Sequence, residues 1–534
     1  MPHIKQSFPL RIYPLGNTRT QTQQQKTVPL WLKHLGLWTL CSILSFSLLL
    51  IATKTSPLYP INDWPDANTF LTLGKGMMKG LVPYRDLFEQ KGPLLYFIHG
   101  LASLVSNHSF LGVFFFEVIS FTVFLYFTLK TIALFIPSRY SLLVLPIFAA
   151  AVLNLRSFAH GDTAESFVFP FLMVSLHSLL KHFKEQDPEP MDSKVLLVNG
   201  IMAGCVLWIK YAFLGFWLGW ILLIFFSLFL KRKYLLALKA SLVFLAGMLI
   251  ATVPWLVYFS LTRSLSEWIN TYFILNLTIY PEAVTFSQII RTALLSFKQH
   301  LTFNPPTITL LAFGTLIFLT TRKFIRSPLL RGGLFLSIGL LALGVYGGGK
   351  DYIYYFLVFA PFLIFGFILL ANFYAENLDK EINPMLTALL IFLVSFIAIA
   401  YTLRFNRNTY MLDWEKSDMV QFKFAARIHQ SDEQTLLNYG FQDAGFYTAA
   451  GIIPNVKYYQ KYNFTYGEFP INMDEQNRYV QEERTEFLVL RLNPGEKIKS
   501  LNIPYLDSNY HMIDRDKQSF GETEYTYLLY QRNN

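Results

Sequence analysis

Cysteine and charge are both scarce in this sequence. Its two cysteines, Cys41 and Cys205, lie inside apolar runs, so we expect neither a disulfide framework nor a metal–thiolate site. Charged side chains make up 15% of the chain, against about 25% in an ordinary soluble domain. This scarcity excludes a typical soluble enzyme. Aromatic residues make up 17%, which also excludes a disordered or nucleic-acid-binding tail, and we expect no nucleic-acid partner.

Apolar residues are abundant instead, at 53% of the chain, and the mean hydropathy is +0.36. Runs near the roughly 20 residues that span a bilayer recur up to residue 403. We expect a mostly α-helical polytopic bundle of about eleven transmembrane helices, with the termini on opposite sides. The predicted spans are 31–52, 110–129, 141–154, 166–180, 196–210, 212–230, 234–259, 305–321, 333–346, 354–371 and 384–403.

Loop charge orients this bundle, because Lys and Arg concentrate in short cytoplasmic loops. The sequence predicts a disordered cytoplasmic lead at 1–30 and a transmembrane domain at 31–403. Residues 404–534 predict a soluble extracytoplasmic α/β domain, with helices and strands in alternation. The formal charge of +10 divides into a net of about −3 from residue 404 onward and about +13 before it. The basic excess therefore belongs to the membrane part.

The first outer loop, 53–109, is far longer than a connection requires, and such loops are usually functional. Asp63 followed by Pro65 predicts a helix start, with Asp63 as the cap. Apolar residues then recur at helical spacing, and Gly80 can end the helix. A second helix is predicted from Pro93. Residues 94–106 are too short for a comfortable membrane span. We expect both helices to lie at the outer membrane interface.

Three stretches of this loop resemble a known family: 66–70 (DANTF), 80–86 (GLVPYRD) and 88–96 (FEQKGPLLY). They are similar to the GT-C membrane glycosyltransferases, in the family 39-like branch of protein O-mannosyltransferases and lipid A aminoarabinose transferases. The resemblance implies a GT-C bundle with two interfacial helices and a polyprenyl-phosphate sugar donor. Many members have an acidic pair at the first stretch, whereas Ala67 stands here at its second position.

The resemblance gives Asp66 the role of general base, with Asp63 as a helper. Sugar transfer to a hydroxyl needs a base for the acceptor proton and cations for the leaving phosphate. Helix capping by either aspartate is the alternative interpretation. Four cations at the outer ends of spans are candidate donor-phosphate ligands: Lys91, Lys210, Arg156 and Lys350. Simple extension of these side chains to the lipid headgroups is the alternative.

A second acidic cluster is predicted near the fourth span. Asp162 and Glu165 are three residues apart, and this spacing predicts one helical face that holds the acceptor, a cation or Arg156. A salt-bridged helix start is the alternative. His160 lies nearby and leaves a divalent cation open, but loose spacing of this kind is weak evidence, so we predict no obligatory cofactor and no metal.

Other residues have less specific signals. The resemblance places Tyr354 and Tyr355 beside the donor, although tyrosine is also the ordinary residue of membrane interfaces. Glu117 lies inside an apolar run and is expected to pair between helices. The aromatic stretch 458–466 suits either stacking on sugar rings or a half-buried strand.

The sequence therefore predicts an integral membrane glycosyltransferase in a bacterial plasma membrane. It would transfer a sugar from a polyprenyl-phosphate donor to a cell-envelope glycan or lipid on the outer face. Two alternatives stay open: a transporter or flippase of lipid-linked sugars, and a non-catalytic membrane protein that binds envelope polymer.

Overall fold

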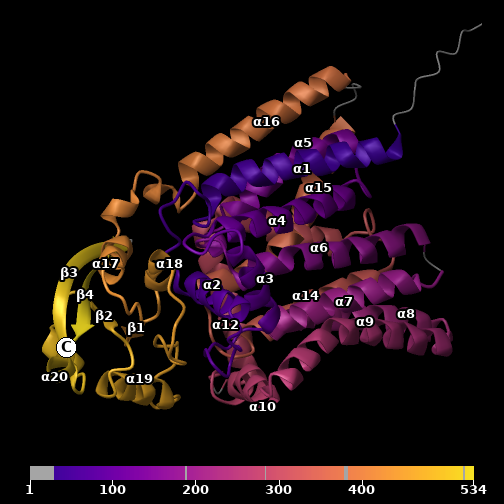
Figure 1. Ribbon diagram of the computed structural model, residues 1–534. Coiled ribbons are helices and arrows are strands. Elements are labelled where there is room, and N and C mark those ends of the chain that lie inside the picture. The colour runs from indigo at the N-terminus through magenta and orange to yellow at the C-terminus, as the bar shows by residue number, and fades with distance from the viewer. Residues whose placement is uncertain (1–28, 187–188, 283, 378–382, 521–522, 534) are drawn as a thin grey trace, which may run out of the picture.

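The computed structural model describes residues 29–533 except 187–188, 283, 378–382 and 521–522. The protein is mostly helical with one small sheet (Figure 1). The long helices run side by side, and residues 406–533 pack against one end of this bundle, next to α2 (Pro65–Met78). The predicted lead at 1–30 lies almost wholly outside the described residues.

Every predicted span contains a helix. Eight stretches of the described residues are long and apolar enough to cross a membrane, with α7 and α8 counted as one. The chain is therefore an integral membrane protein, whereas the count of eleven spans stays a prediction. The α-helices found at the eleven predicted spans are α1 (Leu30–Ala52), α4 (Leu111–Ile132), α5 (Ser138–Leu153), α6 (Ala164–Lys181), α7 (Ser193–Lys210), α8 (Gly215–Leu230), α9 (Tyr234–Leu261), α13 (Pro305–Thr320), α14 (Pro328–Tyr346), α15 (Leu363–Asn377) and α16 (Pro384–Phe405).

Glycines allow a close helix contact between α7 and α9. A Cβ on Gly200 would lie 2.0 Å from the carbonyl oxygen of Phe244, and one on Gly247 would lie 2.3 Å from that of Leu197. Small residues let helix backbones approach where lipid gives no hydrophobic driving force between helices. This contact fixes the position of α7, whose far end carries Lys210.

The first outer loop contains the two predicted helices, α2 and α3 (Pro93–Ser103). Pro65 stands at the first helical position, as expected, but the N-cap is Trp64 and not Asp63. The prediction of a one-sided surface helix was also wrong for α2. Its residues 67–76 are all buried, because the C-terminal part of the chain covers the face that would otherwise meet water.

Residues 260–304, which lie between the predicted spans 234–259 and 305–321, form further helices. They are α10 (Leu265–Ile269), the π-helix η4 (Asn270–Leu275), α11 (Asn276–Thr278) and α12 (Phe286–Phe303). A capping box between Thr285 and Gln288 starts α12, a local signal that the sequence offered. The remaining short helices are η1 (Arg156–Phe158), η2 (His182–Gln186), η3 (Tyr211–Leu214) and η5 (Ile353–Phe362).

The C-terminal part holds a four-stranded sheet in the order β1-β2-β4-β3. Strand β2 pairs parallel to β1 and antiparallel to β4, and β3 pairs antiparallel to β4 at the edge. Sequence reasoning missed β3, because its alternating charges suit an exposed edge strand and resemble a polar loop. The elements are η6 (Thr409–Met411), η7 (Lys416–Asp418), α17 (Val420–Ile428), β1 (Leu436–Tyr439), α18 (Phe446–Ala450), α19 (Ile471–Gln481), β2 (Phe487–Leu492), η8 (Ile498–Leu501), α20 (Leu506–Asn509), β3 (Tyr510–Phe520) and β4 (Thr523–Arg532).

The α7–α9 contact gives a first prediction. We expect Gly200→Ala to lower the Tm of the detergent-solubilised protein by several degrees, because the new methyl group meets backbone that cannot move aside. Gly339→Ala is the matched control, since a Cβ there meets no atom within 4 Å and alanine favours helix by about 0.8–1 kcal/mol over glycine. Equal Tm values for the two variants would contradict the close contact. Circular dichroism on heating provides the measurement.

Candidate active site

A cavity of about 410 Å³ lies at the junction of the first outer loop, the end of α7, residues 272–281 and the end of α14. Two of the predicted phosphate ligands, Lys91 and Lys210, line it together with the predicted donor-lining Tyr355. The other lining residues are Gln90, Tyr211, Ala212, Tyr272, Asn276, Leu277, Tyr280, Pro281, Leu343, Gly344, Val345, Gly347 and Gly348.

Lys91 is held in the cavity wall by its own backbone. Its carbonyl oxygen accepts hydrogen bonds from the hydroxyls of Tyr84 at 2.7 Å and Tyr96 at 3.0 Å, and its N–H donates to Glu89 at 2.6 Å. The Lys91 Nζ lies 3.7 Å from the Glu89 carboxylate. Burial lowers the pKa of Lys91, but Glu89 and Asp66 outweigh that effect and hold the pKa above its usual value. Lys91 therefore keeps its positive charge.

Lys210 lies where α7 ends and the chain turns into η3. Its Nζ donates to Glu165 at 2.7 Å and lies 3.9 Å from the centre of the Tyr355 ring. The second carboxylate oxygen of Glu165 is buried and has no hydrogen-bond partner. The Lys210 ammonium group thus faces the cavity with a carboxylate and an aromatic ring behind it, as a charge at this depth requires.

Asp66 stands in the first turn of α2, beside the cavity but not in its lining. Tyr354 donates a hydrogen bond of 3.3 Å to its carboxylate. Burial raises the pKa of Asp66, and the positive charges of Lys91 and Lys210 only partly offset this while Glu89 and Glu165 add to it. A carboxyl with a raised pKa, close to two fixed cations, suits proton abstraction.

No protein-family model and no curated protein matches the sequence. Among solved structures, the chain is similar to ArnT from Cupriavidus metallidurans bound to undecaprenyl phosphate, with a TM-score of 0.57 at 11% identity over 93% of this chain and 97% of that one. The chain thus shares the fold of that ArnT structure. AglB from Archaeoglobus fulgidus, in complex with an inhibitory peptide and a dolichol-phosphate, matches at a TM-score of 0.44 and 11% identity, over 86% of this chain and 69% of that one.

The fold agrees with the one that the resemblance implied, but not every predicted residue joins the cavity. Asp63 forms an ion pair with Lys54 at 2.7 Å, and both side chains are buried. Burial raises the pKa of Asp63, but Lys54 outweighs it and holds the pKa below its usual range. Lys54 also donates to Tyr410 at 2.9 Å. These are the contacts of a structural ion pair, and no contact joins Asp63 to the cavity.

The prediction that Asp162 and Glu165 share one helical face was wrong. Asp162 precedes α6, with a positive φ of 57°, and forms a buried ion pair with His99 at 2.7 Å. Glu165 stands in the first turn of α6 and pairs with Lys210 instead. Among the described residues, no group of three His, Cys, Asp or Glu side chains is placed to hold a metal ion.

Glu117 pairs between segments, as predicted. Its carboxylate accepts hydrogen bonds from the hydroxyls of Thr53, at 2.9 Å, and Thr55, and from the backbone N–H of Asp162 at 2.7 Å. The loop at 159–162 comes close enough for this because Gly161 has no side chain: a Cβ there would lie 1.9 Å from the hydroxyl oxygen of Thr53. Glu117 thus ties the end of α1 to the start of α6.

The two remaining predicted cations lie outside the cavity lining. The guanidinium of Arg156 is exposed and lies 5.5 Å from the centre of the Phe303 ring, so no contact brings it to the cavity. The Nζ of Lys350 lies 4.3 Å from the centre of the Tyr280 ring, and Tyr280 is itself a lining residue. Lys350 therefore stands behind one wall.

Sequence reasoning missed several lining residues. Gln90 stands beside Lys91 and has a buried side-chain oxygen without a partner. Asn276 donates to the Gln90 carbonyl at 2.7 Å and to the Tyr272 carbonyl at 3.0 Å. Proximity to Lys91 was a usable signal for Gln90. Nothing local marks Tyr272 or Asn276, which reach the cavity only because 270–278 folds back onto the first outer loop.

The different contacts of the two aspartates give a second prediction. We expect Asp63→Asn to lower the Tm clearly, since breaking a buried ion pair costs about 3–5 kcal/mol. Asp66→Asn should leave the Tm unchanged or raise it slightly, because burial already favours the neutral form of this carboxyl. Thermal unfolding of the two purified variants provides the comparison. A larger loss for Asp66→Asn would reverse the assignment of structural and functional aspartate.

Proposed function

We propose that the protein is a glycosyltransferase that moves a sugar from a polyprenyl-phosphate carrier to an acceptor hydroxyl. One observation carries this: Lys91 and Lys210, far apart in sequence, line the same cavity beside Asp66. Two cations facing one space suit a phosphate, and the raised pKa of the adjacent carboxyl suits a base. The similar fold of an ArnT structure bound to undecaprenyl phosphate supports the choice of ligand.

In the proposed reaction, the acceptor oxygen forms a bond to the anomeric carbon of the sugar. The bond between that carbon and the phosphate oxygen breaks, and its electron pair stays on the polyprenyl phosphate. Lys91 and Lys210 would stabilise the added negative charge. Asp66 would take the acceptor proton, and Tyr354, which donates to it, would hold the carboxylate in position. We propose no obligatory cofactor.

We further propose a bacterial plasma membrane as the location, with 31–403 as its membrane domain. The basic loops 130–139, 181–194 and 322–331 would lie inside, and 404–534 outside. The acceptor would then be a cell-envelope glycan or lipid. A flippase of lipid-linked sugars and an envelope-polymer-binding protein remain the alternatives, and both would need the cavity without needing the base.

The proposal predicts opposite behaviour for two variants. Asp66→Asn should lower kcat about 100- to 10,000-fold, the usual contribution of a general base, and should still bind undecaprenyl phosphate. Lys91→Met should weaken that binding. Transfer in proteoliposomes and microscale thermophoresis with the lipid measure the two effects. Lys79→Met and Asp507→Asn, at exposed positions outside the cavity, are the controls. Full transfer by Asp66→Asn would rule out the base. Movement of the lipid-linked sugar across the bilayer by the wild type, without any transfer, would favour the flippase.

The protonation of Asp66 gives a pH prediction. Burial raises the pKa of Asp66, so the carboxyl takes up its proton at a higher pH than an ordinary aspartate does. The base is lost as the pH falls through that raised pKa, while Lys91, whose pKa is also raised, stays charged. We therefore expect kcat to fall on the acid side at a higher pH than an ordinary aspartate would produce. A rate that is constant down to about pH 4, the ordinary range for aspartate, would contradict a raised pKa.

A further inference from the structure

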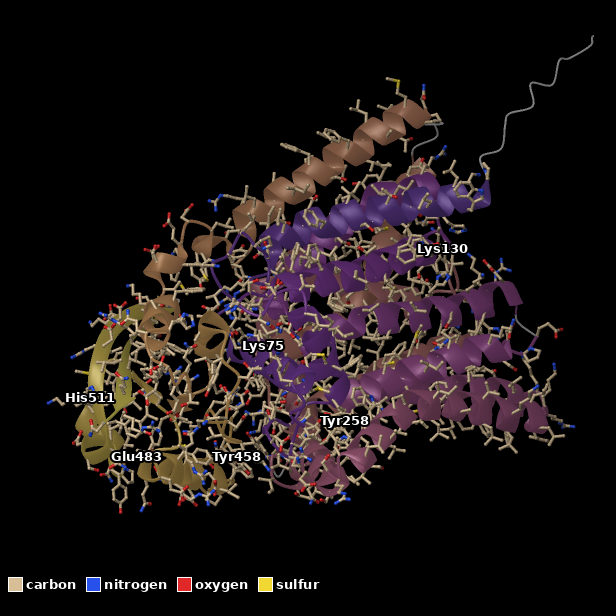
Figure 2. The ribbon with its side chains drawn as sticks, in the orientation of Figure 1. Lys75, Lys130, Tyr258, Tyr458, Glu483 and His511 are labelled. Atoms are coloured by element: carbon tan, nitrogen blue, oxygen red, sulfur yellow. The ribbon has the colours of Figure 1, made fainter. Side chains whose placement is uncertain are left out.

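The aromatic stretch 458–466 has a position that neither sequence interpretation anticipated. It forms no strand, and Tyr458, Tyr459 and Tyr462 are buried. Figure 2 shows Tyr458 and Lys75 of α2 where the C-terminal part meets the helices. Residues 445–463, from the start of α18 through this stretch, are here named the seam segment. Its contacts reach three elements that form or flank the cavity.

The first contacts are to α2, close behind Asp66. The hydroxyl of Thr448 donates to the Asn68 side-chain oxygen at 2.9 Å, and the Gln460 amide donates to the Thr69 hydroxyl at 2.8 Å. All four side chains are at most 5% exposed. Asn68 in turn donates to the carbonyls of residues 62 and 64, at 2.7 and 2.9 Å. Thr448 thus fixes the side chain that holds the start of α2, where Asp66 stands.

The second set of contacts is to the loop that precedes Lys91. The hydroxyl of Tyr462 donates to the Phe88 carbonyl, and the Phe88 N–H donates to the Lys457 carbonyl at 3.1 Å. The Phe88 ring also packs against the Tyr462 ring with centres 4.8 Å apart. The seam segment therefore holds both the N–H and the carbonyl of Phe88, three residues before Lys91.

The third contact is to the segment that carries Tyr354. The side-chain amide of Asn463 donates to the Tyr352 hydroxyl, and the Tyr352 ring stacks on Tyr354 with centres 5.7 Å apart. The approach at the other end of the seam segment is equally close. A Cβ on Gly445 would lie 2.5 Å from a methyl carbon of Ile61, and its φ of +107° suits glycine alone.

We infer that the seam segment positions the reacting groups of the site: Thr448 and Gln460 hold Asp66 through α2, and Tyr462 holds Lys91 through Phe88. These are positioning residues, since none of them lines the cavity. The inference rests on the proposed function and adds to it a division of labour. Loss of the contact to α2 should act on the base, and loss of the contact to Phe88 should act on the phosphate ligand.

Two conservative variants and one control test this division. Thr448→Val should lower kcat by about ten- to a hundred-fold with little change in the donor KM, because small misplacement of a reacting group has effects of that size. Tyr462→Phe should raise the donor KM and weaken binding of undecaprenyl phosphate, with a smaller effect on kcat. Tyr510→Phe removes a buried hydroxyl outside the seam segment, which donates to the Thr485 carbonyl at 2.8 Å, and should change neither.

Hydrogen–deuterium exchange of the full-length protein in detergent gives a readout that needs no substrate. Thr448→Val should speed exchange in peptides covering 65–78, and Tyr462→Phe in peptides covering 83–92, while Tyr510→Phe speeds neither. If the wild type transferred no sugar and bound no polyprenyl phosphate, the proposed function would fail, and these exchange rates would still decide whether the seam segment holds the two elements. Kinetics and exchange indistinguishable from Tyr510→Phe would overturn the inference.

Discussion

The site depends on the close contact between Gly92 and the end of α7. The Gly92 N–H donates to the Ile209 carbonyl at 3.1 Å, and a Cβ on Gly92 would lie 2.0 Å from the carbonyl oxygen of Trp208. Lys91 directly precedes Gly92, and Lys210 directly follows Ile209. One backbone contact, which only glycine permits, therefore places two cations in one cavity. No side-chain interaction between the lysines could do so, because like charges repel.

Two half-buried cations need compensation, and three carboxylates lie near them. Glu89 faces Lys91 and Glu165 faces Lys210, so each lysine has a carboxylate of its own. Among the described residues, Asp66 has no cation within ion-pair distance, and it accepts a hydrogen bond from Tyr354. A carboxylate that is committed to an ion pair has a low pKa and makes a poor base. Asp66 is free to take a proton because Glu89 and Glu165 already pair with the two lysines.

The predictable part of the site is the part with local signals. Lys91 follows a motif, Lys210 interrupts two apolar runs, and Asp66 follows a helix-starting proline. Asp63 was predicted as a helper of Asp66, but its partner Lys54 lies across a turn that no periodicity reveals. Residues 272–281 were missed for the same reason. Spans and strands follow from hydropathy and alternation, whereas ion pairs and cavity walls are made by segments that meet only in the folded chain.

The C-terminal part also changes what the first outer loop can be. A helix with one apolar face was expected to lie on the membrane, yet α2 buries polar side chains such as Asn68 and Thr69 on its other face. Buried polar groups need partners, and Thr448 and Gln460 provide them from nearly four hundred residues later in the chain. Without Thr448, the Asn68 side-chain oxygen would lose its donor, and without Gln460 the Thr69 hydroxyl would keep only its bond to the Pro65 carbonyl. The stability of α2, and with it the place of Asp66, is therefore a property of the whole chain and not of the membrane part alone.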